Sequence, residues 1–314
     1  LGVIFDTDVD RGGAVDSKGD ELNRNRLVAI ASAIALEGNE GGTIVTDSIT
    51  SSGLKEYIEK TLGGHHHRFK RGYRNVINEA VRLNKEGVNC PLAIETSGHA
   101  ALRENYFLDD GAYLVTKIII KLATLRRQGK DLETMLADLR EPVEATELRM
   151  PIDAADFEAV IAGLETWSKE HGWTIAPDNR EGIRVSFGEG EGDGWFLLRL
   201  SVHDPIMPLN IESDVKGGVR VITEKLYEYL KTCEGLDISP CGQIPCLTRA
   251  DRALSRRFPR ILLCKPHDLL CLLRILRIGH DQIQSVGGEV LQKAGKLRFS
   301  DNQDEPFSCF LDPS

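Results

Sequence analysis

The first residues of the chain carry three aspartates at alternate positions, in the segment LGVIFDTDVDRGG. Three carboxylates within five residues repel one another, and a bound cation would relieve that repulsion. Mg²⁺ prefers oxygen ligands at about 2.0–2.1 Å and usually keeps positions for water or a phosphate. We therefore expect Asp6, Asp8 and Asp10 to hold Mg²⁺. The alternative is a solvated acidic turn after a strand. An EF-hand is excluded, because its sixth and twelfth positions would be Arg11 and Ser17 instead of Gly and Glu.

A second cluster, IETSGH, brings a carboxylate, a hydroxyl and an imidazole within five residues: Glu95, Ser97 and His99. The carboxylate accepts hydrogen bonds, the hydroxyl donates and accepts them, and Gly98 lets the backbone approach a ligand closely. This combination suits vicinal sugar hydroxyls, although Ser-Gly-His is also common in turns. A catalytic triad is disfavoured, because no G-x-S-x-G elbow surrounds Ser97.

Two further segments could meet an anion. In WFLLRLSVHDP, Arg199, Ser201 and His203 alternate at the end of an expected strand, and a guanidinium with a hydroxyl suits a phosphate dianion. The alternative is a strand with one polar face. The segment HHHRFKRGYRNVI is interpreted as a basic loop before a helix, from which Lys70 and Arg71 could reach an anionic substrate. Three consecutive histidines cannot share one face, so no metal site is expected there.

Hydrophobic periodicity predicts strands alternating with helices in the first half of the chain. Strands are expected at 3–5, where the strand is buried, 43–51 and 91–99, and helices at 20–37, 53–64, 75–87 and 109–129. This order favours a mixed, mostly parallel sheet with helices on both faces. Ligands of such sheets bind beyond the carboxyl ends of the strands, where these polar clusters lie.

The second half has a different pattern. A charged linker is expected at 131–147, followed by a strand at 147–152, a helix at 156–172, three strands at 182–187, 195–201 and 206–213, and a helix at 219–231. That order is typical of a smaller α+β domain, at 148–231, with helices on one face of an antiparallel sheet. Residues 232–314 form a tail of unknown structure. Its CGQIPC and CKPHDLLC segments match no common zinc spacing, and we favour an appended segment or a sequence that encodes no native domain.

Composition restricts the partners and the compartment. The net charge of −9 argues against nucleic acid as a partner. The sequence contains no run of 18 or more apolar residues, so no membrane span is predicted. Seven cysteines without a CxxC pair are typical of reduced, intracellular use, which predicts an intracellular soluble protein. The chain begins at Leu1, so we expect a fragment or a processed chain. The oligomeric state is left open.

Five motifs, taken in order, resemble those of the phosphohexomutase superfamily, which comprises phosphoglucomutase, phosphomannomutase and phosphoglucosamine mutase. They are FDTDVDRGG, VTDSITSSGL, FKRGYRNVI, IETSGHAALRENYFLDDGAYL and the pair GIRVSF with GWFLLRLSVHDPIMPLNIES. The resemblance covers residues 1–231 and is nearest to a plant-type branch, which implies the cytoplasm or the plastid stroma as the compartment. It implies that residues 1–16 end a truncated metal-binding domain and that residues 17–130 form a sugar-binding domain, so the chain would be the C-terminal half of a four-domain α/β enzyme.

The resemblance also implies an activity and roles for the site residues. A phosphoserine would pass a phosphoryl group to a hexose phosphate, and the resulting hexose bisphosphate would return the other phosphate. The three aspartates would hold Mg²⁺, with Arg11 against the transferring group and His99 as general acid or base. Glu95 and Ser97 would bind sugar hydroxyls. The distal phosphate would be anchored by Arg199 and Ser201, with His203 nearby.

Two departures from the family pattern limit these roles. The Ser-His-Asn-Pro motif of the serine loop is absent from the 314 residues, so the chain alone is expected to be inactive. After Ser201 the chain has Val202, His203 and Asp204 where the family has Gly or Asn and then Thr. An aspartate near a phosphate is unfavourable unless it points away, so the phosphosugar is left open.

Two alternative functions belong to other classes. One is a haloacid-dehalogenase-like phosphatase, whose motif order is approached by Asp6 and Asp8, then Ser48, Lys70, and Asp109 with Asp110. Against it, Asp10 replaces the Thr or Val of the first motif, and LDDGAYL opens a helix. The other is a non-catalytic sugar-phosphate-binding fragment that kept the pocket without the nucleophile.

Overall fold

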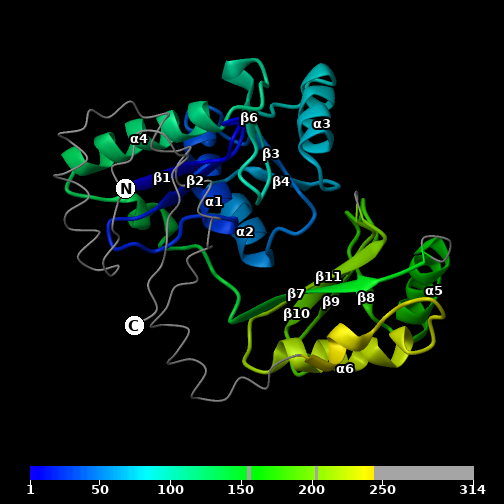
Figure 1. The fold of residues 1–314 in the computed structure, drawn as a ribbon. Coiled ribbons are helices and arrows are strands. Elements are labelled where there is room, and N and C mark those ends of the chain that lie inside the picture. The colour runs from blue at the N-terminus through cyan, green and yellow to red at the C-terminus, as the bar shows by residue number, and fades with distance from the viewer. Residues whose placement is uncertain (154–156, 202–203, 244–314) are drawn as a thin grey trace, which may run out of the picture. The chain divides into compact units, whose positions relative to one another are not determined.

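The computed structural model describes residues 1–153, 157–201 and 204–243 (Figure 1). The first of two larger sheets has four strands in the order β4-β3-β5-β6. Their bounds are β4 His65–Arg68, β3 Thr43–Thr46, β5 Leu92–Ile94 and β6 Ala100–Leu102. β3 is parallel to β4 and β5, and β6 is antiparallel to β5. The predicted mixed, mostly parallel sheet is confirmed.

Helices cover both faces of this sheet because its central strands, β3 and β5, are buried on both sides. Ile44 and Leu92 face the core formed with α1 (Asn25–Leu36) and α4 (Gly111–Arg127). On the opposite face, Val45 and Ala93 pack against α3 (Tyr73–Lys85). The apolar side of this helix consists of Val76, Ala80 and Leu83. Buried parallel strands with helices on each side are the expected arrangement for such near-continuous apolar strands.

The remaining helical segments of this region are short. α2 spans Ser52–Glu56, continues as a π-helical turn at Tyr57–Thr61, and has Ser51 as its N-cap. Two 3₁₀ helices lie at Arg103–Asn105 and Leu132–Leu136. The second lies in the segment predicted as a linker, and its Leu132 is buried in the first core.

The N-terminal segment forms a separate two-stranded antiparallel ribbon. β1 (Gly2–Phe5) pairs with β2 (Gly12–Val15). The predicted strand is present, but the expectation that it is buried is wrong, because Val3 and Ile4 are 36% and 56% exposed. The only strand that pairs with β1 in the described part of the chain is β2, and the side chains of Val3 and Ile4 remain exposed on it.

The three histidines form a strand, where the sequence predicts a basic loop. In β4 successive side chains point to opposite faces, and the rings of His66 and His67 each have a hydrogen-bond partner. The His66 ring lies 2.7 Å from Thr46 Oγ1, and the His67 ring lies 2.8 Å from Glu79 Oε1. The loop proper is limited to residues 69–72, between β4 and α3.

The second sheet has five strands in the order β7-β11-β10-β9-β8, and every pairing in it is antiparallel. The strands are β7 Glu144–Pro151, β8 Thr174–Ile175, β9 Ile183–Phe187, β10 Gly194–Leu198 and β11 Ile206–Ser213. α5 (Phe157–Glu170) and α6 (Gly218–Leu230) bury one face around Phe196, which confirms the predicted α+β architecture. The opposite face carries Arg184, Trp195 and Glu212, whose alternation with the apolar residues places them there.

Residues 232–243, which the sequence alone assigns to the tail, pack in part against this second core. Leu236 and Cys241 are buried in it, and a 3₁₀ helix spans Ser239–Gln243. The rest of the tail, including its later cysteines, lies outside the described residues. In the described part of the chain, each helix is too short or too polar to cross a membrane.

The contact between Gly53 and residue 140 provides a test of the first core. A Cβ at Gly53 would collide with the carbonyl oxygen of Arg140, and a backbone atom cannot rotate away. We expect Gly53→Ala to lower the free energy of unfolding by about 2 kcal/mol, measured by urea denaturation. Gly188→Ala is the matched control, because nothing lies within 4 Å of a Cβ there. Equal stability of the two variants would contradict the described contact.

Candidate active site

The three aspartates lie in the loop that joins β1 to β2. One carboxylate oxygen from each of Asp6, Asp8 and Asp10 lies within 4.8 Å of the other two. Arg11 neutralises part of this charge, because its Nε lies 2.6 Å from Asp6 Oδ2 and its backbone N–H donates to Asp6 Oδ1 at 3.1 Å. Burial alone would raise the pKa of Asp6, but these bonds from Arg11 lower it below the usual value.

Asp10 lies among other acids. Burial raises its pKa, the neighbouring Asp6, Asp109 and Asp8 raise it further, and His99 opposes them. Its Oδ1 is buried and has no hydrogen-bond partner among the described residues. A buried acceptor without a donor is costly, and a hard cation with oxygen ligands would satisfy it. The donor set therefore fits Mg²⁺.

The IETSGH turn lies directly against this acidic loop. The Gly12 N–H donates to the Gly98 carbonyl at 3.2 Å, and Arg11 forms an isolated β-bridge with His99. Gly98 has φ +101°, and a Cβ on it would lie 2.5 Å from the Gly12 carbonyl oxygen. Only glycine allows this approach without strain. The structure thus brings together two motifs that are separated by about ninety residues in the sequence.

His99 is fixed by groups from three segments. Its Nδ1 lies 2.8 Å from Asp109 Oδ2 and 3.7 Å from Asp10 Oδ1, and its ring stacks on Tyr73 with centroids 4.9 Å apart. Burial lowers the pKa of His99, but the hydrogen bond to Asp109 and the negative charges of Asp109, Asp10 and Glu95 together outweigh it, and the net shift is upward. Mutase motifs alone did not indicate Asp109 or Tyr73. In the sequence only their positions distinguish them: Asp109 lies just before the start of α4, and Tyr73 is the first residue of α3.

Glu95 and Ser97 point toward the start of α3. Glu95 is 3% exposed, and its carboxylate accepts from the Gly72 N–H at 2.6 Å and from Ser97 Oγ at 3.1 Å. Lys70 is exposed on the same 69–72 loop. The two residues predicted to bind sugar hydroxyls are therefore held together at the carboxyl end of β5.

A buried acid that the sequence did not indicate lies beside Glu95. Asp47, at the end of β3, is fully buried, and its Oδ2 accepts from Thr96 Oγ1 at 2.7 Å. Burial and the charge of Glu95 raise the pKa of Asp47 to about 6. In the sequence it is only the polar end of TIVTDSITS, so nothing but the tertiary structure distinguishes it.

Arg199 follows β10 and is 4% exposed. One of its terminal nitrogens donates to the Leu200 carbonyl at 3.4 Å and lies 3.9 Å from Glu181 Oε1. Its Nε is buried without a hydrogen-bond partner among the described residues, and burial lowers its pKa. The Ser201 N–H donates to the Ile206 carbonyl at 2.9 Å, which closes the turn after Arg199. His203 lies outside the described residues.

A series of short contacts joins the acidic loop to Arg199. His99 contacts Asp10, the 95–99 turn contacts Gly72 through Glu95, and the neighbouring Arg71 N–H donates to Glu181 at 3.0 Å. Glu181 in turn faces Arg199. The acidic loop, His99, Glu95 with Ser97, and Arg199 therefore lie along one series of contacts, whereas Lys70 and Ser201 are neighbours of it in the sequence.

The residues of the phosphatase alternative have other partners. Asp110 is the N-cap of α4 and accepts from the Tyr113 N–H at 2.8 Å. Ser48 Oγ donates to Glu181 Oε2 at 2.5 Å, and Asp109 pairs with His99. A capping carboxylate at a helix start is a structural role. The structure therefore gives Asp110 no place in an acidic phosphatase cluster.

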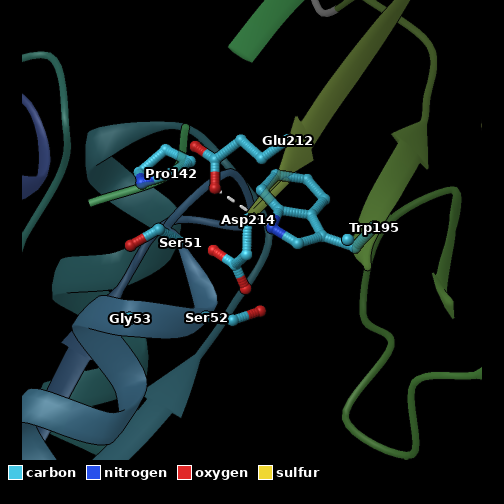
Figure 2. A pocket seen from close by; sticks show the side chains of 8 residues that line it. Ser51, Ser52, Gly53, Pro142, Trp195, Glu212 and Asp214 are labelled. Carbon is cyan, nitrogen blue, oxygen red and sulfur yellow. Dashed lines mark hydrogen bonds between the residues drawn. The ribbon is translucent and has the colours of Figure 1, made fainter. Parts of the chain in front are cut away.

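A separate pocket is shown in Figure 2. It is lined by Ser51, Ser52, Gly53, Pro142, Gly194, Trp195, Glu212 and Asp214. Trp195 Nε1 donates to Glu212 Oε2 at 3.1 Å, and burial raises the pKa of Glu212 to about 7. None of the predicted site residues lines it.

The comparison with known proteins finds similarity to phosphoglucomutases and phosphomannomutases. Residues 23–143 match the family model described as phosphoglucomutase/phosphomannomutase, alpha/beta/alpha domain III. A phosphomannomutase/phosphoglucomutase of Pseudomonas syringae pv. tomato is 28% identical over 234 residues, which are 74% of this chain and 47% of that protein. A phosphoglucomutase of Neisseria gonorrhoeae is 28% identical over 229 residues, 72% of this chain and 46% of that protein. The chain spans about half the length of these curated relatives.

Two solved structures are also similar to this chain. The phosphoglucomutase/phosphomannomutase family protein of Burkholderia thailandensis superposes with a TM-score of 0.61 at 26% identity, over 74% of this chain and 46% of that one. The phosphoglucomutase of Paramecium shares the fold, with a TM-score of 0.53 at 16% identity over 74% of this chain and 45% of that one. Over about three quarters of its length the chain is thus similar to phosphoglucomutases and phosphomannomutases, and its residues 23–143 match their domain III.

Proposed function

We propose that this chain provides the sugar-binding and distal-phosphate-binding part of a phosphohexomutase, which moves a phosphoryl group between two oxygens of a hexose phosphate. The observation that carries the proposal is the series of contacts from the acidic loop to Arg199. It has a buried carboxylate oxygen without a partner at one end, on Asp10, and a buried guanidinium nitrogen without a partner at the other, on Arg199. A ligand with a phosphate at one end and a metal-assisted reacting group at the other would satisfy both.

At the acidic end, Asp6, Asp8 and Asp10 would hold Mg²⁺, and the ion would offset negative charge on the transferring phosphoryl group. Arg11 would bring its guanidinium to the same side, where its side chain is half exposed and free to turn toward an anion. His99 would give or take a proton at its free Nε2, because Asp109 holds Nδ1 and fixes the ring.

In the middle of the series, Glu95 and Ser97 would exchange their mutual hydrogen bond for bonds to vicinal sugar hydroxyls. Lys70, exposed on the adjoining loop, would face the anionic ligand. Arg199, with Ser201 and His203, would anchor the phosphate that does not react. A buried guanidinium gains most from a dianion because few water molecules compete with it.

We also propose which part of the enzyme the chain forms, its substrates and its compartment. The chain would correspond to the C-terminal half of a plant-type phosphohexomutase, acting on hexose phosphate and hexose bisphosphate in the cytoplasm or the plastid stroma. No Ser-His-Asn-Pro motif occurs in the 314 residues, so the chain on its own would bind the sugar phosphate without converting it. That missing motif also favours the second candidate, a non-catalytic sugar-phosphate-binding protein. Turnover after addition of a serine-loop half would separate the two.

Metal binding tests the acidic end. We expect the chain to take up one Mg²⁺ in calorimetric titration and Asp8→Asn to weaken the affinity at least tenfold, because a neutral amide replaces one of three carboxylates. Asp8 is exposed, so the substitution leaves the core intact. Asp138→Asn, at another exposed acid, is the control. Equal Mg²⁺ affinity of the Asp8 variant and the wild type would contradict the assignment.

Ligand binding tests the other end. We expect Arg199→Lys to weaken glucose 6-phosphate binding about tenfold in calorimetric titration, because lysine loses the two-pronged donor geometry but keeps the charge. Arg220→Gln, on the outer side of α6, should bind like the wild type. Circular dichroism would verify that both variants fold. Unchanged affinity of a folded Arg199 variant would remove the distal phosphate site from the proposal.

A further inference from the structure

Glu181 is the residue around which the donors near Arg199 converge. Its Oε2 accepts from Ser48 Oγ at 2.5 Å and from the Arg71 N–H at 3.0 Å, and its Oε1 lies 3.9 Å from Arg199 Nη1. A hydroxyl, a backbone amide and a guanidinium are the donors that proteins use for phosphate. Here a carboxylate of the chain itself occupies the position where they meet.

The loop that carries Glu181 is built tightly against the second sheet. It joins β8 to β9, and Asn179 closes it by donating to the Gly182 carbonyl at 2.8 Å and accepting from the Arg184 N–H at 3.1 Å. Gly182 has φ +53°, and a Cβ on it would collide with the Leu198 carbonyl, next to Arg199. This approach fixes the start of β9 beside the end of β10. Glu181 is therefore placed by its backbone next to Arg199.

A second acid of the same loop provides a comparison. Asp178 lies 3.3 Å from Arg68 Nη1 and is not paired with Arg199. Arg68 has further partners, because it also donates to Thr50 Oγ1 at 3.1 Å. Arg199 is different, since its Nε has no partner among the described residues. The Arg199 guanidinium thus has donor capacity that Glu181 leaves unused.

We propose that Glu181 is an internal competitor for the phosphate of the ligand: its carboxylate occupies the anion position formed by Ser48, Arg71 and Arg199 until a phosphate displaces it. This inference rests on the proposed function of Arg199 as the anchor of the distal phosphate. Two anions cannot share one set of donors at hydrogen-bond distance without strong repulsion. Binding of a phosphate must therefore include the release of the Glu181 side chain, which lowers the apparent affinity.

The same competition would select for charge. A phosphate dianion brings more charge and more acceptor oxygens than the carboxylate that it displaces, whereas a singly charged sugar acid brings no more than Glu181 itself. The wild-type chain should therefore discriminate strongly between glucose 6-phosphate and glucuronate. Removing the charge of Glu181 should improve the binding of both.

The test is calorimetric titration of the full chain with glucose 6-phosphate. Glu181→Gln keeps an oxygen that accepts from Ser48 and Arg71 but removes the charge, so we expect about tenfold tighter binding than in the wild type. Asp178→Asn is the matched control, because it removes one charge from the same loop without changing the group beside Arg199, and its affinity should stay within twofold of the wild type. Binding by Glu181→Gln where the wild type shows none also supports the proposal. An affinity of Glu181→Gln equal to or weaker than that of the wild type overturns it.

The Arg199→Lys variant separates this proposal from the one on which it rests. If Arg199→Lys weakens binding and Glu181→Gln does not tighten it, the phosphate anchor stands and the competitor is rejected. If Arg199→Lys has no effect, alone or combined with Glu181→Gln, the proposed function of the site fails and the competitor role fails with it. Thermal denaturation of each variant ensures that only folded protein is compared.

Discussion

The hydrogen bond from the Gly12 N–H to the Gly98 carbonyl is the contact on which the arrangement of the candidate site depends. It holds the acidic β1–β2 loop against the turn after β5, and glycine is required at position 98 because a Cβ there would lie 2.5 Å from the Gly12 carbonyl oxygen. A second close approach supports it, since a Cβ on Gly111, at the start of α4, would lie 2.6 Å from the Arg11 carbonyl carbon. Without these approaches His99 would not reach Asp10.

Charge is the second constraint, because acids alternate with hydrogen-bond donors along the series of contacts. Three acids of the series have a donor at hydrogen-bond distance: Asp6 has Arg11, Glu95 has the Gly72 amide, and Glu181 has the Ser48 hydroxyl. The groups at the two ends are left incompletely satisfied, and both are buried. Unsatisfied buried polar groups are rare in native proteins and need an explanation. A bound ion at one end and a bound phosphate at the other would give one explanation for both.

Much of this organisation could be predicted from the sequence, and the failures have physical reasons. Alternation of Asp6, Asp8 and Asp10, the IETSGH turn, and the periodicity of the long helices are local features that sequence patterns report directly. The His65–Arg68 strand was missed because the polarity of histidine conceals the alternation, which becomes favourable only when Thr46 and Glu79 pair with the rings. The burial predicted for Val3 and Ile4 is wrong, because apolar side chains in a sequence do not show whether other residues pack over them in the structure. Glu181 and Asp47 carry no local signal, since their environments are made by residues distant in the sequence.

The central claim is that the acidic loop binds a divalent cation beside His99, and paramagnetic broadening by Mn²⁺ tests it most directly. His99 Nδ1 lies 3.7 Å from Asp10 Oδ1, whereas His171 stacks on Trp167 at the end of α5, with centroids 4.2 Å apart, and belongs to no cluster of potential metal ligands among the described residues. In proton NMR spectra of the chain, we expect the ring signals of His99 to broaden at substoichiometric Mn²⁺ while those of His171 stay sharp, and excess Mg²⁺ to reverse the effect. Equal broadening of both histidines, or broadening of neither, would contradict the account.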